Sequence, residues 1–389
     1  MDKITIGIAG AGAMGSGIAQ VAATAGHPVW LFDISEEALV KSKSKLDKIM
    51  ARLVEKGRIS AEQSSQIREA IRYTTTLEDL KDSELVIEAI VERLEVKSKV
   101  FESLETIVSQ QTILASNTSS LSITSIAAAC KIPGRVIGLH FFNPAPLMKL
   151  VEVIPAIQTE ESLASKMADL MKMWGKYPVI AKDTPGFIVN RIARPYYGEA
   201  LKIYEEGLAD IPVIDAAMTE VGFRMGPFTL MDYIGNDVNY TVANTVFEAF
   251  YGDPRYRPSI LHKRMMEAGY LGRKSGRGFY RYDENLRPVP IAASQMVLNK
   301  EQIAHRIICM LINEAVDALY LQIASREDIE TAMTMGVNYP KGLLAWADEI
   351  GIKRCVDTLD ELYDWYHDMR YRCSPLLRQM AKEYRTFFH

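Results

Sequence analysis

One histidine and one glutamate lie twelve residues apart in the stretch GLHFFNPAPLMKLVEV, residues 138–153. His140 ends an apolar run, and Glu152 lies inside the hydrophobic segment that follows a turn with two prolines. If that turn acts as a hairpin centred near Pro146, the two residues face each other across paired strands. A carboxylate beside an imidazole fixes its tautomer and stabilises the imidazolium, which is general acid–base chemistry. The residues alone also allow a partly buried structural histidine beside an edge-strand glutamate.

Polar residues also follow the apolar segment TILAS, residues 112–116. Asn117, Thr118 and Ser119 come directly after this predicted strand. Residues of these types form helix caps and turns, and local chemistry favours that interpretation. Open α/β sheets, however, bind ligands at the carboxyl ends of their strands, so the same groups are candidates for ligand contacts.

The stretch DTPGFIVNRI, residues 183–192, is typical of a helix start. Asp183 or Thr184 would cap the helix, and Pro185 would occupy its first turn. Asn190 would then lie in the second turn, where asparagine is a mediocre helix former. Its amide either bonds locally or is presented to a ligand.

The N-terminal segment predicts a scaffold for these groups. KITIGIAG, residues 3–10, predicts a buried strand that leads into G-x-G-x-x-G, formed by Gly10, Gly12 and Gly15. A helix-like segment follows, and then a second strand that ends at Asp33. The glycines allow a tight turn, close approach of the backbone to a pyrophosphate, and close packing of helix on strand. The pattern predicts a dinucleotide site, and Asp33 favours NAD over NADP because it would bind the ribose hydroxyls and repel a 2′-phosphate.

The rest of the first half alternates between predicted helices and strands. Residues 36–72 read as two helices, and within them the lysine- and arginine-rich stretch 41–58 favours a solvated helix face over a local anion site. Alternation of this kind predicts a doubly wound α/β domain, to which we assign residues 1–182. The further strands are expected at 84–90, 112–116, 135–140 and 150–154.

Composition excludes several classes of function. A chain of 389 residues with a net charge of −4 has no general attraction for nucleic acid or an anionic membrane. Four widely spaced cysteines without C-x-x-C indicate reduced thiols, and the six scattered histidines give no metal motif. Residues 4–27 carry no charge but are rich in glycine and alanine, so we interpret them as part of a cytoplasmic protein rather than a membrane span.

The second half contains an internal repeat of a mostly helical domain. VNRIARPYYGEA, residues 189–200, aligns with AHRIICMLINEA, residues 304–315. DPRYRPSILHKRM, residues 253–265, recurs as DMRYRCSPLLRQM, residues 368–380. A nearly constant offset across separate stretches indicates a duplicated domain.

We assign residues 183–290 to copy 1 of this domain and residues 291–389 to copy 2, with the join near the proline-containing stretch 283–300. In copy 2, the position that aligns with Asn190 holds a histidine, His305. One active site per chain is therefore expected.

Seven stretches occur together in the order found in L-3-hydroxyacyl-CoA dehydrogenases: GAGAMGSGIAQ, VIEAIVERLEVKSKVF, SNTSSLSIT, GLHFFNPAPLMKLVEV, DTPGFIVNRI, MGPFTLMD and GRKSGRGFYRY. The sequence resembles that family, which includes 3-hydroxybutyryl-CoA dehydrogenases, over roughly residues 3–282. It is most similar to the forms with a duplicated C-terminal domain that are often associated with phenylacetate catabolism. The resemblance implies a Rossmann-like domain, NAD as cofactor and an acyl-CoA as substrate.

The resemblance also implies a role for individual residues. His140 matches the general base and Glu152 the carboxylate that orients it, while Ser119 and Asn190 match the groups that hydrogen-bond the reacting oxygen of the substrate. Lys56 matches a lysine that contacts CoA, whereas the neighbouring CoA-contacting serine of the family falls on Ile49. The expected cofactor-binding residues are Gly10, Gly12, Ala13, Met14, Gly15, Asp33, Glu92, Lys97, Asn143 and Lys274.

Two other functions remain open at this point. A dehydrogenase of free 3-hydroxyacids typically uses a lysine on the helix after the nucleotide domain, where this chain has Asn190. An NAD-binding structural or regulatory relative would not need to retain the four candidate catalytic residues. Single-copy family members pair their C-terminal domains between subunits, so copy 2 is expected to supply that pairing within one chain, and a homodimer is left open. The acyl chain length is also left open.

Overall fold

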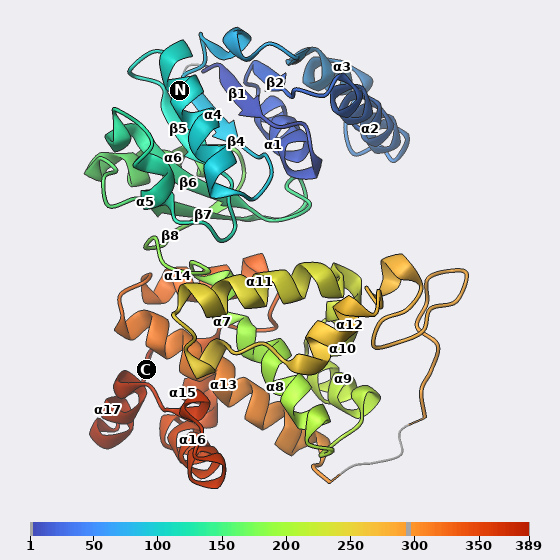
Figure 1. Cartoon of the computed structure of the whole chain (residues 1–389), viewed down its shortest axis with the longest axis vertical. Helices are drawn as coiled ribbons and strands as arrows, with labels where there is room; N and C mark the ends of the chain where they lie inside the picture. Colours follow the sequence, from blue (N-terminus) through green and yellow to red (C-terminus); the bar gives the residue numbers. More distant parts are fainter. Residues whose placement is uncertain (1–2, 293–296, 389) are drawn as a thin grey trace. The chain divides into compact units, whose positions relative to one another are not determined.

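The computed structural model describes residues 3–292 and 297–388, which separate into two compact units, unit 1 up to Phe187 and unit 2 from Ile188 (Figure 1). The predicted join at 283–300 therefore lies partly outside the described residues. No helix in the described part of the chain has the length and apolar character needed to cross a bilayer.

Unit 1 is built on one eight-stranded sheet with the order β3-β2-β1-β4-β5-β6-β7-β8. All neighbouring strands are parallel except the antiparallel pair β6 and β7. This confirms the predicted doubly wound α/β fold. The strands are β1 (Ile6–Ala9), β2 (Val29–Phe32), β3 (Ile71–Thr74), β4 (Leu85–Glu88), β5 (Ile113–Ser116), β6 (Val136–Phe141), β7 (Leu150–Pro155) and β8 (Tyr177–Ile180).

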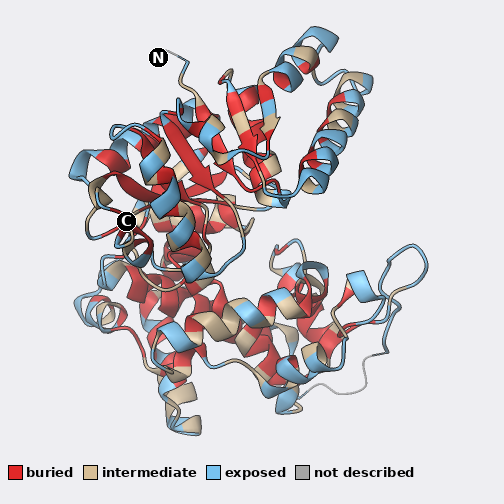
Figure 2. Ribbon diagram, turned by 45° about the horizontal axis from the view of Figure 1, so that its top comes forward, coloured by how far each residue is buried: buried red, intermediate tan, exposed pale blue. Residues whose placement is uncertain are grey.

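The sheet forms because its central strands are continuous apolar runs, the pattern of a parallel sheet covered on both faces. Every residue of β1, β4, β5 and β6 is buried, and Figure 2 shows the strands as the buried centre of this unit. The helices that cover it are α1 (Ala13–Thr24), α2 (Glu36–Glu55), α3 (Ala61–Glu69), α4 (Leu94–Ile107), α5 (Ile123–Ala127) and α6 (Glu161–Met173). The strands β3 and β8 were not predicted.

Unit 2 is entirely helical and contains both copies of the repeat. Copy 1 contributes α7 (Val189–Ile192), α8 (Arg194–Glu205), α9 (Ile211–Glu220), α10 (Pro227–Ile234), α11 (Asn236–Ala249) and α12 (Ile260–Glu267). Copy 2 contributes α13 (Lys300–Tyr320), α14 (Arg326–Thr331), α15 (Leu343–Ile350), α16 (Ile352–Tyr366) and α17 (Pro375–Glu383).

Equivalent capping contacts show how closely the copies correspond. Asp215 accepts hydrogen bonds from the first backbone N–H groups of α10, and Glu330 does the same for α15. Gly235 and Gly351, both at positive φ, precede α11 and α16. The predicted duplication is therefore visible in the backbone.

The two copies are joined by buried carboxylates that accept hydrogen bonds from the opposite copy. Glu314 of copy 2 accepts from Arg191 Nε at 2.6 Å, from Arg255 Nη1 at 3.3 Å and from the Tyr256 hydroxyl at 2.5 Å, all in copy 1. The fully buried Glu199 of copy 1 receives the matching set from copy 2. The donors to Glu199 are Arg306 Nε at 2.7 Å, Arg370 Nη1 at 3.4 Å and the Tyr371 hydroxyl at 2.9 Å.

This exchange is the arrangement expected of a two-fold pair, with equivalent residues contacting each other's partners. Burial raises the pKa of the Glu199 and Glu314 carboxyls, but the arginine charges and hydrogen bonds outweigh it and hold both pKa values below the usual range. Both residues are therefore carboxylates at neutral pH.

Removing one of these buried charges tests how much they contribute to the stability of the protein. We expect Glu314→Gln to lower the free energy of unfolding by about 3 kcal/mol, because it leaves buried guanidinium groups without their counter-charge. Urea unfolding followed by circular dichroism measures this change.

A matched control is Asp357→Asn, which removes the partner of Lys353 in an exposed pair on α16. Water screens this exposed pair, so the variant should unfold almost as the wild type does. Equal losses in the two variants would contradict the importance assigned to Glu314.

Candidate active site

His140 and Glu152 face each other across the β6–β7 pair, as predicted. The antiparallel register places His140 opposite Glu152, and the imidazole Nδ1 lies 2.6 Å from the carboxylate Oε2. His140 is 6% exposed and Glu152 is fully buried. The rings of Phe142 and Phe187 lie 4.4 Å and 6.0 Å from the imidazole, measured between centroids. A carboxylate at Nδ1 selects the tautomer that leaves Nε2 able to take a proton from a ligand.

A loop of hydroxyl residues lies at the same edge of the sheet, because β5 runs parallel to β6. Asn117 Oδ1 accepts from the backbone N–H of Phe141 at 2.9 Å, which ties this loop to the residue after His140. Glu92 Oε1 accepts from the Thr118 hydroxyl at 2.6 Å and from the Ser119 backbone N–H at 3.0 Å. The loop is thus anchored on both sides.

The predicted helix cap in this loop lies elsewhere. Ser122, not Ser119, caps α5, while Thr118 closes a turn by accepting from the backbone N–H of Leu121 at 2.9 Å. The Ser119 side chain therefore does not serve as the helix cap. Its position at the carboxyl end of β5 matches the edge at which α/β proteins bind ligands.

Exposed Glu92 meets the buried Lys97 in a polar network that also includes the buried Glu88, which the sequence analysis did not single out. Lys97 Nζ lies 2.5 Å from Glu88 and 3.2 Å from Glu92. Burial alone would raise the pKa of Glu92. The Lys97 charge and hydrogen bonds from Thr118 and Ser119 lower it by more than burial raises it, so the pKa lies below its usual value. The signal for Glu88 was present as an acid at the end of an apolar strand, similar to the acid within an apolar strand that marked Glu152.

The glycine loop has the geometry that a dinucleotide requires. Gly10 has φ +109°, and a Cβ there would lie 2.6 Å from the carbonyl oxygen of Ala89. A Cβ on Gly15 would lie 1.8 Å from the carbonyl oxygen of Gly10, so the close approach of helix and strand needs glycine. A Cβ on Gly12, at the start of α1, would meet nothing within 4 Å, so this backbone faces open space where a pyrophosphate fits.

Ala13 and Met14, which follow Gly12, form the first turn of α1, whose N-terminus is a favourable place for an anion. Asp33 follows β2 and accepts from the backbone N–H of Ala11 at 2.7 Å and of Ser35 at 2.9 Å. These contacts fix its carboxylate beside the glycine loop. The predicted cofactor residues at this end of the sheet thus lie together around the glycine loop, and we call them the nucleotide cradle. Their contacts with the adenosine ribose and pyrophosphate stay a prediction.

The predicted helix start at 183–192 is wrong. Gly186 and Phe187 both have positive φ, which breaks a helix, and α7 begins only at Val189. Asp183 instead accepts from the backbone N–H groups of Ile123 and Thr124, at 3.0 and 2.7 Å, and so caps α5. Asn190 consequently lies in the first turn of α7.

Two predicted site residues, Asn190 and Lys274, belong to unit 2. Lys274 Nζ pairs with the Asp237 carboxylate at 2.6 Å and is partly exposed. Its predicted cofactor contact stays a prediction, and so does the substrate contact of Asn190.

A pocket of about 480 Å³ opens in unit 1 between α1, α2 and the turn that separates β6 from β7. Asn143, predicted for the cofactor region, lines it, and so does Ile49, the position where the family serine is missing. Lys45 is the cation on its wall. Lys56 lies at the end of α2, exposed, and does not line the pocket.

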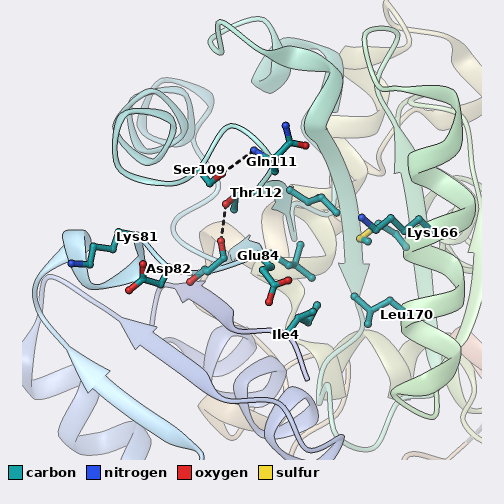
Figure 3. A pocket seen from close by; sticks show the side chains of 13 residues that line it. Ile4, Lys81, Asp82, Glu84, Ser109, Gln111, Thr112, Lys166 and Leu170 are labelled. Atoms are coloured by element: carbon teal, nitrogen blue, oxygen red, sulfur yellow. Dashed lines mark hydrogen bonds between the residues drawn. The ribbon is translucent and has the colours of Figure 1, made fainter. Parts of the chain in front are cut away.

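Another pocket, of about 600 Å³, lies at the opposite edge of the sheet (Figure 3). Its wall includes Glu84 and Thr112, which immediately precede β4 and β5. The Thr112 hydroxyl donates to the Ser83 carbonyl at 2.7 Å. Ligands of open α/β sheets bind at the carboxyl ends of the strands, so this amino-end pocket is not part of the candidate site.

Sequence comparisons identify the same family in both units. The family model described as 3-hydroxyacyl-CoA dehydrogenase, NAD binding domain, matches residues 5–184. The model described as 3-hydroxyacyl-CoA dehydrogenase, C-terminal domain, matches twice, at residues 186–282 and 303–386.

Known relatives extend over most or all of the chain. A 3-hydroxyadipyl-CoA dehydrogenase of Escherichia coli K12 is 39% identical over 464 aligned positions, which cover 97% of each protein. A probable 3-hydroxybutyryl-CoA dehydrogenase of Deinococcus radiodurans is 44% identical over 71% of this chain and 99% of that protein. The crystal structure of a 3-hydroxybutyryl-CoA dehydrogenase from Escherichia coli K12 aligns with a TM-score of 0.91 and 37% identity, covering 99% of this chain and 100% of that one.

The nucleotide cradle and these similarities together define an NAD-dependent oxidoreductase. The chain belongs to the 3-hydroxyacyl-CoA dehydrogenase family, in the form with a repeated C-terminal domain. An acyl-CoA substrate is consistent with every relative named above.

Proposed function

We propose that this enzyme interconverts an (S)-3-hydroxyacyl-CoA and the corresponding 3-ketoacyl-CoA, with His140 as the general acid and base. The observation that carries the proposal is the 2.6 Å contact between His140 Nδ1 and the fully buried Glu152 at the carboxyl edge of the sheet. Burying the Glu152 carboxylate costs free energy, and a histidine with only a structural role would not require a charged partner. The pair therefore favours a role in proton transfer.

NAD⁺, when bound, would accept the hydride that leaves C3 of the substrate. His140 Nε2 removes the hydroxyl proton in oxidation and returns it in reduction. Positive charge develops on the imidazole as it takes the proton, and the Glu152 carboxylate stabilises that charge through Nδ1. The phenylalanine rings beside the imidazole exclude water and strengthen this electrostatic interaction.

Ser119 is proposed to hydrogen-bond the reacting oxygen as C3 changes between tetrahedral and trigonal geometry. Its backbone N–H is held by Glu92, and Lys97 with Glu88 holds Glu92 in turn. The network thus positions the serine without touching the substrate. Asn190, on α7, is proposed to assist at the same oxygen.

The 480 Å³ pocket is proposed to hold the pantetheine arm of CoA. Leu46, Ile49 and Leu53 give it an apolar helical wall, and Pro144 and Pro146 face them from the turn after β6. Lys56, three residues beyond Leu53 at the end of α2, is proposed to bind the CoA phosphates. An apolar lining with few polar groups suits a flexible ligand of this kind.

Neutralising the proposed acid–base pair tests the assignment. We expect His140→Gln and Glu152→Gln each to lower kcat by a factor of about 10²–10⁴, because a placed general base contributes that much to the rate. The affinity for NADH should change little. The assay is oxidation of NADH with acetoacetyl-CoA as substrate.

The matched control is His27→Gln, which makes the same change at another buried histidine of unit 1. His27 Nδ1 lies 3.3 Å from the backbone N of Ile4, at the start of β1 rather than at the carboxyl edge. This variant should keep wild-type kcat. Full activity in His140→Gln would rule out the proposed role of that residue.

The acyl group is proposed to be short. Relatives carry the names of 3-hydroxybutyryl-CoA dehydrogenases, whereas the full-length relative of Escherichia coli is named for 3-hydroxyadipyl-CoA, which ends in a carboxylate. The second candidate substrate is therefore an acyl group with a terminal carboxylate. It is favoured by the match to this relative over 97% of both proteins.

A series of substrates separates the two candidates. We expect kcat/KM to be highest for acyl groups of four to six carbons and to fall with longer chains. A preference of tenfold or more for the substrate with a terminal carboxylate, at equal chain length, would assign the second candidate instead. Stopped assays at several substrate concentrations give kcat/KM for each acyl-CoA.

Copy 2 is proposed to replace a second subunit as the pairing partner of copy 1. The exchanged contacts of Glu199 and Glu314 support this, since they join the copies as an isologous interface would.

If the pairing surface of copy 1 is covered in this way, the protein in solution should have the mass of one chain, 43.6 kDa. Light scattering coupled to size exclusion measures the mass. A dimer held together through residues of copy 1 would contradict the proposal.

A further inference from the structure

A small cavity lies in unit 2 among α8, α11 and α12, outside the residues assigned to the active site. We call it the Arg194 cavity, and its lining includes Arg194, Asn239 and His262, one from each helix. A water-sized sphere has about 20 Å³ of space within it. That space is enough for one water molecule or one monatomic ion.

Polar atoms without a partner gather on the wall of this cavity. Within the described residues, no hydrogen-bond partner exists for Arg194 Nη1, Asn239 Oδ1, Arg255 Nε or His262 Nε2. Each of these residues is at least nine-tenths buried. One unsatisfied buried polar group costs about 1–3 kcal/mol, and more when it is charged. Four of them around one small space indicate that a polar species occupies it.

The charge of the cavity identifies the sign of that species. Arg255 and Arg370, which also line the cavity, are neutralised by Glu314 and Glu199. Arg194 donates through Nε to the Asn190 carbonyl at 2.9 Å and stacks 5.1 Å from the Tyr197 ring, but no carboxylate within the described residues pairs with it. Guanidinium groups stay protonated in proteins, so the cavity carries an uncompensated positive charge.

His262 adds a hydrogen-bonding group rather than a second charge. Burial, together with the nearby Arg194 charge, lowers the pKa of its imidazole to about 4. The ring is therefore neutral at neutral pH and can present an N–H at Nε2. Asn239 can present its NH₂ group if the amide is turned over, in which case its oxygen accepts from the Tyr197 hydroxyl.

The repeat supplies an internal comparison. Cys309 and Cys355 of copy 2 stand at the positions of Arg194 and Asn239, and Leu377 stands at the position of His262. The two thiols are fully buried, and their mutual hydrogen bond together with burial raises the pKa of Cys309, so its thiol is uncharged. The same helices thus pack in copy 2 without a guanidinium at the position of Arg194, so Arg194 is not a requirement of the fold.

We propose that the Arg194 cavity is a site for a single halide ion, chloride under ordinary conditions, held by Arg194 Nη1 and the Nε2–H of His262. The ion compensates the buried guanidinium and fills the only space that these donors share. Its ligand differs in size and chemistry from NAD and acyl-CoA, so the site is separate from the proposed catalytic function.

Thermal unfolding in halide and non-halide salts tests the proposal. The wild-type chain is first dialysed into sodium gluconate, and NaCl or NaBr then replaces gluconate at constant ionic strength. A ligand that binds only the folded state raises Tm with saturation, and at a hundredfold excess over Kd the rise should be about 5 °C or more. A crystal soaked in bromide should show an anomalous peak beside Arg194.

The variants use residues that copy 2 or the cavity itself provides. Arg194→Met should abolish the halide-dependent rise in Tm, and His262→Leu, which installs the residue of copy 2, should reduce it. Arg257→Met is the matched control, because Arg257 lines the cavity but is exposed and should leave the rise unchanged.

An equal Tm in halide and gluconate with no anomalous peak in the wild type would mean that the cavity holds only water, and would overturn the proposal. A rise that persists in Arg194→Met would overturn it as well. If Arg194→Met does not fold, the bromide peak in the wild type and the response of His262→Leu decide the matter.

Discussion

A carboxylate taken out of water must meet a cation, and this requirement organises both units of the molecule. Glu88, Glu152, Glu199 and Glu314 are almost completely buried, and each has a cationic or protonatable partner within 3 Å. A pair of this kind adds little stability compared with an apolar core. It does fix which side chains must be neighbours, and the two units use that in different ways.

In unit 1 the buried acids position the candidate catalytic side chains. Glu152 orients the imidazole of His140, while Glu88 and Lys97 hold Glu92 under the loop that carries Ser119. Glu88 and His140 lie at or near the carboxyl ends of β4 and β6, and the loop with Ser119 follows β5. Glu152 reaches the same edge from near the amino end of β7, because β7 runs antiparallel to β6. The same sheet edge presents the glycine loop. A continuous apolar sheet and a few buried charges are thus enough to bring the His140–Glu152 pair to the same edge as the glycine loop.

Features that depend on local sequence were predictable, and features that depend on distant contacts were not. The glycine loop, the central strands and the facing positions of His140 and Glu152 follow from periodicity and turn chemistry alone. The strands β3 and β8 were missed because they are short edge strands, IRYT and YPVI, with polar or proline residues. The helix start at 183 was wrong because Asp183 caps α5, sixty residues away in sequence, and no local pattern reveals that partner. Glu88 carried a readable signal, an acid closing an apolar strand.

The duplicated helical domain shows which contacts the two copies share and where they differ. Its exchanged arginine, tyrosine and glutamate contacts are kept in both directions, since losing either side would leave a buried charge unpaired. Some positions outside that exchange differ between the copies: Asn190 corresponds to His305, and Arg194 to Cys309. His305 instead hydrogen-bonds the Thr358 hydroxyl at 2.9 Å within copy 2. Pairing therefore constrains the residues that contact the opposite copy. Residues such as Asn190 and Arg194, which do not take part in that exchange, can differ between the copies.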